Sequence, residues 1–157
     1  PTPKRIGIFG GTFDPIHFGH LRLAEEVGES LNLEHIYLIP AALPPHKGPK
    51  TVSPFRHRLE MTRIASAESP LLKVLDLEAR REGFSYSIET LKTFHTMFQP
   101  DLDLHFVLGM DAFLEIETVR HVLRRFDRKA AVGMKRPFRF SGGARSVMII
   151  NGSSAPV

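Results

Sequence analysis

Short apolar runs alternate with helical patterns along most of the chain, and this alternation restricts the possible folds more than any other feature. The runs expected to form buried strands are rich in Ile, Val, Leu, Phe and Tyr, and they cover residues 5–9, 35–40, 72–77, 104–109 and 129–134. Between them, apolar residues recur every three or four positions, as in Leu21, Ala24, Val27 and Leu31. Strands that alternate with crossover helices form a parallel sheet covered on both faces. We therefore expect an α/β domain whose ligand site lies at the carboxyl ends of the strands.

The composition fits one domain and excludes several kinds of site. A chain of 157 residues with 42% hydrophobic content is long enough for a single core, so we expect residues 1–157 to form one domain. The sequence contains no cysteine, which excludes disulfides and thiol chemistry and favours a cytoplasmic location. The apolar run at residues 6–9 is too short to cross a membrane, so we expect no membrane partner. A formal net charge of +4 favours anionic partners such as nucleotides, nucleic acid or lipid headgroups, and the charge alone does not distinguish among them.

The segment GGTFDPIHFGH, residues 10–20, follows the first expected strand and predicts a phosphate site. Gly10 and Gly11 allow backbone N–H groups to approach a ligand closely. A helix is expected to begin near Gly19 or His20, which places His17 and His20 at the positive end of its dipole. The chain has neither a dinucleotide-binding glycine motif nor a P-loop, and it lacks a nucleophile elbow and a zinc-binding HExxH helix. What remains is phosphate chemistry carried out by histidines, lysines and the backbone.

The same segment resembles the signature of the nucleotidyltransferase superfamily, and specifically of bacterial nicotinate mononucleotide adenylyltransferases. Other segments match patterns of that family: LIPAALPPHK (38–47), HRLEMTRIA (57–65), SYSIETL (85–91) and FVLGMDAF (106–113). The resemblance extends from Arg5 to about Pro137 and implies a Rossmann-like nucleotidyltransferase fold. It also implies an activity, the transfer of AMP from ATP to nicotinate mononucleotide, which gives nicotinate adenine dinucleotide and pyrophosphate in NAD biosynthesis.

The resemblance further implies a set of site residues. The two that would contact the phosphates and stabilise the transition state are His17 and His20. The residues that would bind ATP are Gly10, Gly11, Thr12, Phe13, Gly109 and Asp111. The residues that would bind the acceptor or its phosphate are His46, Lys47, Ser85, Tyr86 and Ser87. The sequence shows no dedicated metal-ligand cluster, so Mg²⁺ is expected to be carried by the phosphates of ATP.

Neighbouring charged residues are expected to have structural roles. An in-line attack of a phosphate oxygen on the α-phosphorus of ATP requires alignment and charge neutralisation but no protein nucleophile. Asp14 precedes a proline and is expected to brace the turn rather than to react. Arg56, Arg58 and Arg63 lie on the helix expected after the basic loop and are expected to have a supporting role rather than to react, with Arg56 paired to Glu60 on the solvated face of the helix.

Two departures from the family pattern leave other interpretations open. Val119 replaces a tryptophan that stacks on the pyridine ring in the family, and the sequence reaches Val157 without the family's closing I-S-S-T-x-I-R element. The C-terminal element is therefore expected to be incomplete. A second interpretation is a related adenylyltransferase that acts on nicotinamide mononucleotide or pantetheine phosphate. A third is a non-catalytic nucleotide- or nucleic-acid-binding module, although the first interpretation includes no nucleic-acid partner. The sequence carries no signal for the oligomeric state.

Overall fold

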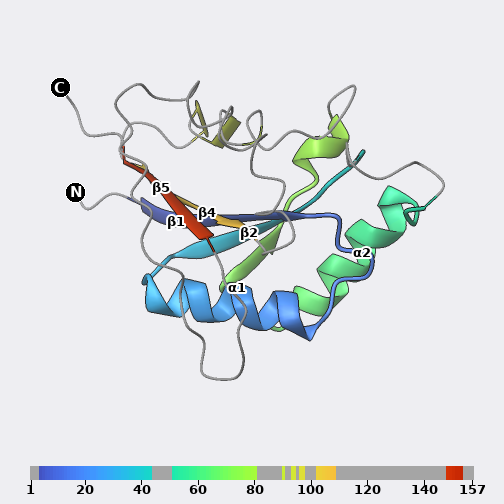
Figure 1. Ribbon diagram of the computed structural model, residues 1–157, viewed down its shortest axis with the longest axis horizontal. Helices are drawn as coiled ribbons and strands as arrows, with labels where there is room; N and C mark the ends of the chain where they lie inside the picture. Colours follow the sequence, from blue (N-terminus) through green and yellow to red (C-terminus); the bar gives the residue numbers. More distant parts are fainter. Residues whose placement is uncertain are drawn as a thin grey trace.

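The described part of the protein forms one twisted sheet with helical segments on its two faces (Figure 1). A computed structural model describes residues 4–43, 51–80, 90, 93, 94, 96, 97, 102–108 and 148–153. The strands are β1 (Lys4–Gly11), β2 (His35–Pro40), β3 (Leu72–Val74), β4 (Leu102–Leu108) and β5 (Met148–Ser153). They lie in the order β3-β2-β1-β4-β5.

The pairing of the strands confirms the expected parallel sheet for β1 to β4. β1 pairs in parallel with both β2 and β4, and β2 pairs in parallel with β3. The chain builds outwards from β1 through β2 to β3 and then returns to the other side of β1 with β4. This reversal makes the carboxyl ends of β1 and β4 a topological switch point, where open α/β sheets bind their ligands.

The last strand gives the sheet an antiparallel edge that the sequence analysis did not anticipate. β5 runs antiparallel to β4, with Asp103 opposite Ser153 and Leu108 opposite Met148. The strand expected at residues 129–134 lies outside the described residues.

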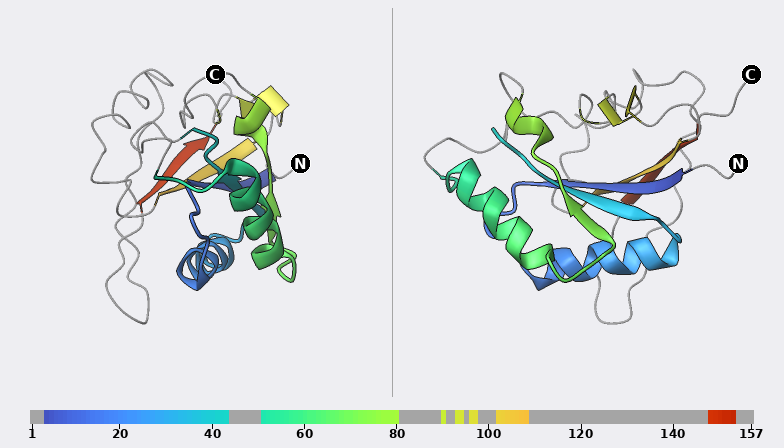
Figure 2. Two further views of the ribbon diagram at one scale, coloured as in Figure 1. Left: turned by 90° about the vertical axis from the view of Figure 1, so that its right-hand side faces the viewer. Right: turned by 180° about the vertical axis from the view of Figure 1, so that it is seen from behind.

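Helical segments cover both faces of the sheet, as predicted. Helices α1 (Phe18–Ser30) and α2 (Phe55–Ser66) lie on one face, and the short 3₁₀ helix η1 (Leu77–Arg80) lies on the other (Figure 2). On the first face, Ala24 and Val27 of α1 join a buried cluster with strand residues such as Phe9. On the second face, the helical residue Phe94 is fully buried in a cluster whose strand members are Ile6, Ile8, Ile39, Leu102, Leu104 and Phe106.

Two boundaries differ from those expected. The run at residues 72–77 was expected to be one strand, but β3 ends at Val74 and η1 begins at Leu77. Leu75 and Leu77 both pack against the second cluster, so the apolar run continues into the core after the strand has ended. Helix α1 begins at Phe18, slightly earlier than expected, because His17 takes the N-cap position. In the ranges described above, no helix has the length and apolar character needed to cross a membrane.

Candidate active site

The loops that follow β1 and β2 meet at the carboxyl edge of the sheet. Gly11 lies opposite Pro40 in the register of β1 and β2, and the N–H of Ala41 donates to the carbonyl oxygen of Gly11 at 2.8 Å. On the other side of β1, Phe9 lies opposite Val107 near the end of β4. The glycine turn is therefore bordered by the ends of both neighbouring strands.

The two glycines of this turn have different reasons to lack a side chain. A Cβ at Gly11 would lie 2.8 Å from Cε1 of Phe13, a contact too short to be tolerated without movement. At Gly10, the nearest described atom to such a Cβ would be the carbonyl oxygen of Ile39, 4.0 Å away. Packing therefore explains the glycine at 11, whereas the contacts of the described residues do not require one at 10. An absent Cβ at Gly10 leaves its backbone open to close approach by a ligand.

His17 and His20 lie together at the amino end of α1. His17 is the N-cap residue, and its backbone N–H donates to Nδ1 of His20 at 3.3 Å. The two imidazole rings are stacked, with centroids 3.8 Å apart and planes inclined by 29°. His17 is exposed and His20 is half-buried. The predicted pair is thus assembled where the helix dipole favours an anion.

Phe13 supports His20 from the core side. Its ring is buried and meets the ring of His20 edge-on, with centroids 5.2 Å apart and an interplanar angle of 84°. It meets Phe9 in the same way at 5.5 Å. The backbone of Phe13 lies in the left-handed region, with a φ of 48°. Any contact between Phe13 and a nucleotide is therefore left to the backbone.

Arg58 connects the site loops, a role that sequence reasoning missed. Its side chain is 1% exposed, and its guanidinium lies among backbone carbonyls rather than in solvent. Nη1 donates to the carbonyl oxygens of Thr12 at 2.7 Å and Ala41 at 2.8 Å. Nε donates to Ser53 at 2.8 Å, and Nη2 donates to Ala42 at 3.3 Å. Burial lowers the pKa of the Arg58 guanidinium below its ordinary value, and the nearby Asp14 carboxylate opposes this shift.

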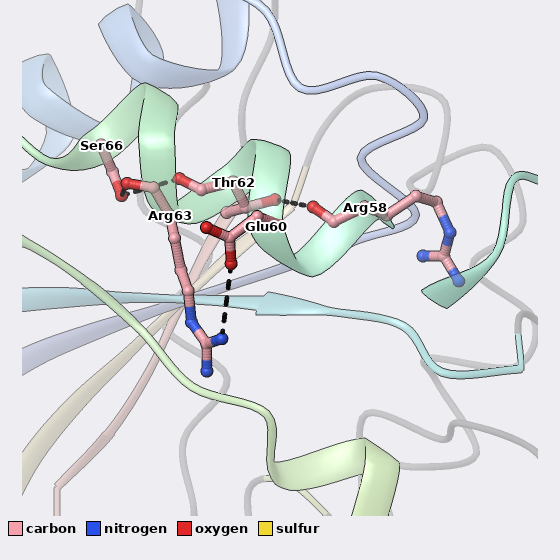
Figure 3. A network of polar contacts seen from close by, with 5 residues as sticks. All are labelled: Arg58, Glu60, Thr62, Arg63 and Ser66. Carbon is pink, nitrogen blue, oxygen red and sulfur yellow. Dashed lines mark hydrogen bonds and ion pairs between the residues drawn. The ribbon is translucent and has the colours of Figure 1, made fainter. Parts of the chain in front are cut away.

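Arg58 lies on a buried stripe of polar side chains, which the sequence pattern alone would place in solvent. Arg58, Thr62 and Ser66 are four residues apart and share one buried stripe of α2. Thr62 Oγ1 donates to the carbonyl of Arg58 at 2.8 Å, and Ser66 Oγ donates to the carbonyl of Thr62 at 2.8 Å (Figure 3). Arg63 leaves the helix in a different direction, towards Glu60, with 3.7 Å between Nη1 and Oε2. Glu60, which was expected to pair with Arg56, therefore forms an ion pair with Arg63.

Asp14 has the bracing role that was predicted for it. Its Oδ2 accepts a hydrogen bond from the backbone N–H of Ser53 at 2.7 Å. The bond reaches across to the segment before α2, which lies 39 positions further along the chain, rather than within its own turn. Asp14 and Arg58 thus hold the N–H and the C=O of the same residue, Ser53.

The remaining predicted site residues are not described by the structure. These residues are His46, Lys47, Ser85, Tyr86, Ser87, Gly109 and Asp111, and their roles stay predictions, as does the effect of Val119. Thr90, close behind the serine–tyrosine segment, is described and buried. Its Oγ1 donates to Oε1 of Glu78 in η1 at 3.0 Å. This buried bond ties the helical residue Thr90 to η1.

The fold agrees with the family to which the chain is similar. Residues 8–153 match the sequence model of the cytidylyltransferase-like family, and the chain belongs to this family. Among the residues that the structure describes, no group of three or more His, Cys, Asp or Glu side chains could hold a metal ion.

Comparison with individual proteins supports a particular branch. The chain is 43% identical over 135 residues to a probable nicotinate-nucleotide adenylyltransferase of Desulfitobacterium hafniense, covering 86% of this chain and 65% of that protein. It is 44% identical over 133 residues to one of Geotalea daltonii, covering 85% of this chain and 61% of that protein. The chain thus spans less than two thirds of the length of these relatives.

Comparison with a solved structure supports the fold. The Plasmodium falciparum nicotinic acid mononucleotide adenylyltransferase complexed with NaAD superposes with a TM-score of 0.62 at 25% identity. The match covers 72% of this chain and 55% of that one. The expected Rossmann-like nucleotidyltransferase fold and the resemblance drawn from the sequence are both confirmed.

Proposed function

We propose that the whole protein is a nicotinate-nucleotide adenylyltransferase, which moves AMP from ATP to nicotinate mononucleotide and releases pyrophosphate. The observation that carries this proposal is the stacked pair His17–His20 at the amino end of α1, beside the glycine turn at the end of β1. The names of the relatives favour nicotinate mononucleotide as the acceptor. The product would be nicotinate adenine dinucleotide, and the reaction would serve NAD biosynthesis.

The chemistry follows from what these groups can donate. A phosphate oxygen of the acceptor attacks the α-phosphorus of ATP, the new P–O bond forms, and the bond to pyrophosphate breaks. Nδ1 of His20 accepts a bond from the N–H of His17, so the neutral ring carries its hydrogen on Nε2. Nε2–H and the dipole of α1 would stabilise negative charge that develops on the phosphates. The open backbone at Gly10 would allow ATP to lie against β1.

Mg²⁺ would accompany ATP rather than occupy a protein cage. Mg²⁺ prefers oxygen ligands and is commonly held by one or two carboxylates together with substrate phosphates. Asp14 contributes a carboxylate to the described turn, but its Oδ2 already accepts a hydrogen bond from the backbone N–H of Ser53. The imidazoles of His17 and His20 and the backbone N–H groups of the turn suit phosphate oxygens better than a magnesium ion. When bound, the cation would neutralise part of the charge on the phosphates.

Further parts of the proposal concern the surroundings of the reaction. We place it in the cytoplasm, with ATP and nicotinate mononucleotide as partners and without nucleic acid or a membrane. We assign residues 1–157 to one nucleotidyltransferase domain. His46 and Lys47 would hold the acceptor phosphate, Ser85, Tyr86 and Ser87 would bind the acceptor, and Gly109 and Asp111 would lie beside ATP.

The test is turnover by the full-length protein with three acceptors. Incubation with ATP and nicotinate mononucleotide should release pyrophosphate and form nicotinate adenine dinucleotide, measured by a coupled phosphate assay and by mass spectrometry. Nicotinamide mononucleotide and pantetheine phosphate are the comparison acceptors, and kcat/KM should be highest with nicotinate mononucleotide. A higher value with either comparison acceptor would replace the substrate assignment. ATP binding without pyrophosphate release for all three would point instead to a non-catalytic nucleotide-binding module.

A further inference from the structure

Arg58 is a planar cation held among backbone carbonyls from separate loops. The acceptor Thr12 lies after β1, Ala41 and Ala42 lie after β2, and Ser53 lies just before α2. A guanidinium directs its N–H groups in fixed directions within one plane, whereas an ammonium on a flexible stem does not. The positions of the carbonyls relative to one another are therefore set by a single rigid group.

The contact with Thr12 reaches the histidine pair in two steps. The carbonyl of Thr12 belongs to the peptide that leads into Phe13, whose φ of 48° is the unusual angle in this turn. Holding that carbonyl holds the ring of Phe13 in its inward position. The ring of Phe13 in turn packs edge-on against His20, 5.2 Å between centroids. A shift of Arg58 would therefore displace the ring of Phe13 that packs against His20.

The contacts with Ala41 and Ala42 act on the second loop. Ala41 also donates its N–H to the carbonyl of Gly11, so the start of this loop is fixed to both the glycine turn and Arg58. The loop continues towards His46 and Lys47, which are proposed to bind the acceptor phosphate. The two substrates of an adenylyl transfer must be aligned within a fraction of an ångström, and a misplacement of about 1 Å can reduce the rate about 10²-fold.

We propose that Arg58 is a positioning residue, which sets the distance between the loop that binds ATP and the loop that binds the acceptor. Arg58 itself touches neither substrate. The proposal rests on the function proposed above, since it assigns the two loops to two substrates. It predicts a loss in kcat rather than in substrate affinity, because each loop keeps its own binding groups and only their alignment changes.

A matched control separates positioning from stability. Leu59 is the next residue of α2 and is buried, and its apolar side chain cannot form hydrogen bonds with the loop carbonyls. Leu59→Ala should loosen α2 without disturbing the carbonyls that Arg58 holds. Arg58→Lys keeps the positive charge, but its ammonium has three N–H donors instead of five and no fixed plane, so it cannot hold all of these carbonyls together. Both variants of the full-length protein are compared at a temperature where thermal melts show them folded.

Steady-state kinetics with ATP and nicotinate mononucleotide give the first readout. Arg58→Lys should lower kcat about 100-fold while each KM changes less than about threefold, as expected when alignment is lost and binding is kept. Leu59→Ala should keep kcat within about threefold of the wild type. An equal loss in kcat in both variants, or a raised KM with normal kcat in Arg58→Lys, would overturn the proposal. Failure of Arg58→Lys to fold at any temperature would also overturn it, because Arg58 would then act on the fold as a whole.

A second readout does not depend on turnover. In protein labelled with ¹³C-histidine, the ring signals of His20 should shift in Arg58→Lys and stay in place in Leu59→Ala. Unchanged His20 signals in Arg58→Lys would refute the positioning role even in an active enzyme. If the wild-type protein forms no product, the proposed function fails, and these signals alone decide whether Arg58 positions His20.

Discussion

The ring of Phe13 meets the ring of His20 edge-on, with centroids 5.2 Å apart. His20 is therefore supported by a buried aromatic side chain on one side, while its Nδ1 is engaged by the backbone of His17. Both contacts are made within the protein itself, so the ring is oriented before any nucleotide binds. A donor that is already oriented does not have to be reorganised during the reaction, which makes it more effective in stabilising the transition state.

The first prediction tests the separate roles of the two ring nitrogens of His20. In His20→Asn, the side-chain oxygen can still accept from the N–H of His17, but no donor remains near Nε2. We expect this variant to fold like the wild type and to lose about 10²–10³-fold in kcat, comparable to the removal of one oxyanion-hole donor. His20→Gln, whose amide reaches towards the position of Nε2, should lose less. Single-turnover kinetics with saturating ATP measure both, and a near-normal kcat in His20→Asn would remove His20 from the mechanism.

The second prediction concerns the glycine pair. Gly11→Ala should lower the free energy of unfolding by about 1–3 kcal/mol, because the new Cβ would collide with the ring of Phe13. Gly10→Ala should change it by less than about 0.5 kcal/mol, since the described neighbours leave room for a methyl group. Thermal melts give the stabilities and calorimetric titration gives the affinity for ATP. Gly10→Ala should bind ATP more weakly, and unchanged affinity would show that ATP does not approach this backbone.

The third prediction addresses the buried bond between Thr90 and Glu78. Thr90→Val keeps the shape of the side chain but leaves Oε1 of Glu78 without this donor, so it should cost about 1–3 kcal/mol of stability. Glu78→Gln keeps an oxygen that can accept from Thr90, and it should cost less. Urea unfolding monitored by circular dichroism measures both. A Thr90→Val variant as stable as the wild type would mean that this bond does not hold Thr90 to η1.

The fourth prediction is a pH dependence at Tyr37. Burial raises the pKa of the Tyr37 phenol above its ordinary value, and the carboxylate of Glu34 raises it further. The unfolded chain therefore loses this proton first, at about pH 10, and the folded chain loses it at a higher pH. The contribution of Tyr37 to stability is present below pH ~10 and is lost as the pH rises through the folded pKa. The stability difference between wild type and Tyr37→Phe should shrink or reverse over that range, and a constant difference would contradict this.

The sequence predicted the features that depend on neighbours along the chain. β2 covers the expected residues because a run of apolar side chains buried on both faces has clear ends. The pairing of His17 with His20 also follows from local spacing, since both lie within one turn at a helix start. The antiparallel direction of β5 could not be predicted, because strand direction depends on connections far from the strand.

Arg58 shows the limit of this approach most clearly. Helical spacing places it on one stripe with Thr62 and Ser66, but a stripe of polar side chains predicts a solvated face, so the burial was not predictable. Its acceptors were not predictable either, because they are backbone carbonyls, which every residue possesses and no letter of the sequence distinguishes. Only the fold brings Thr12 and Ala41 within reach of one side chain.

The contacts of Arg58 also have a consequence for how the protein can change over time. The same guanidinium holds the carbonyls of Ala42 and Ser53, so both ends of the intervening segment are fixed at nearly one point. For a loop closed in this way, doubling its length costs only about 0.6 kcal/mol of closure entropy. Insertions between these two residues should therefore cost the fold little stability, while the histidine pair stays where it is.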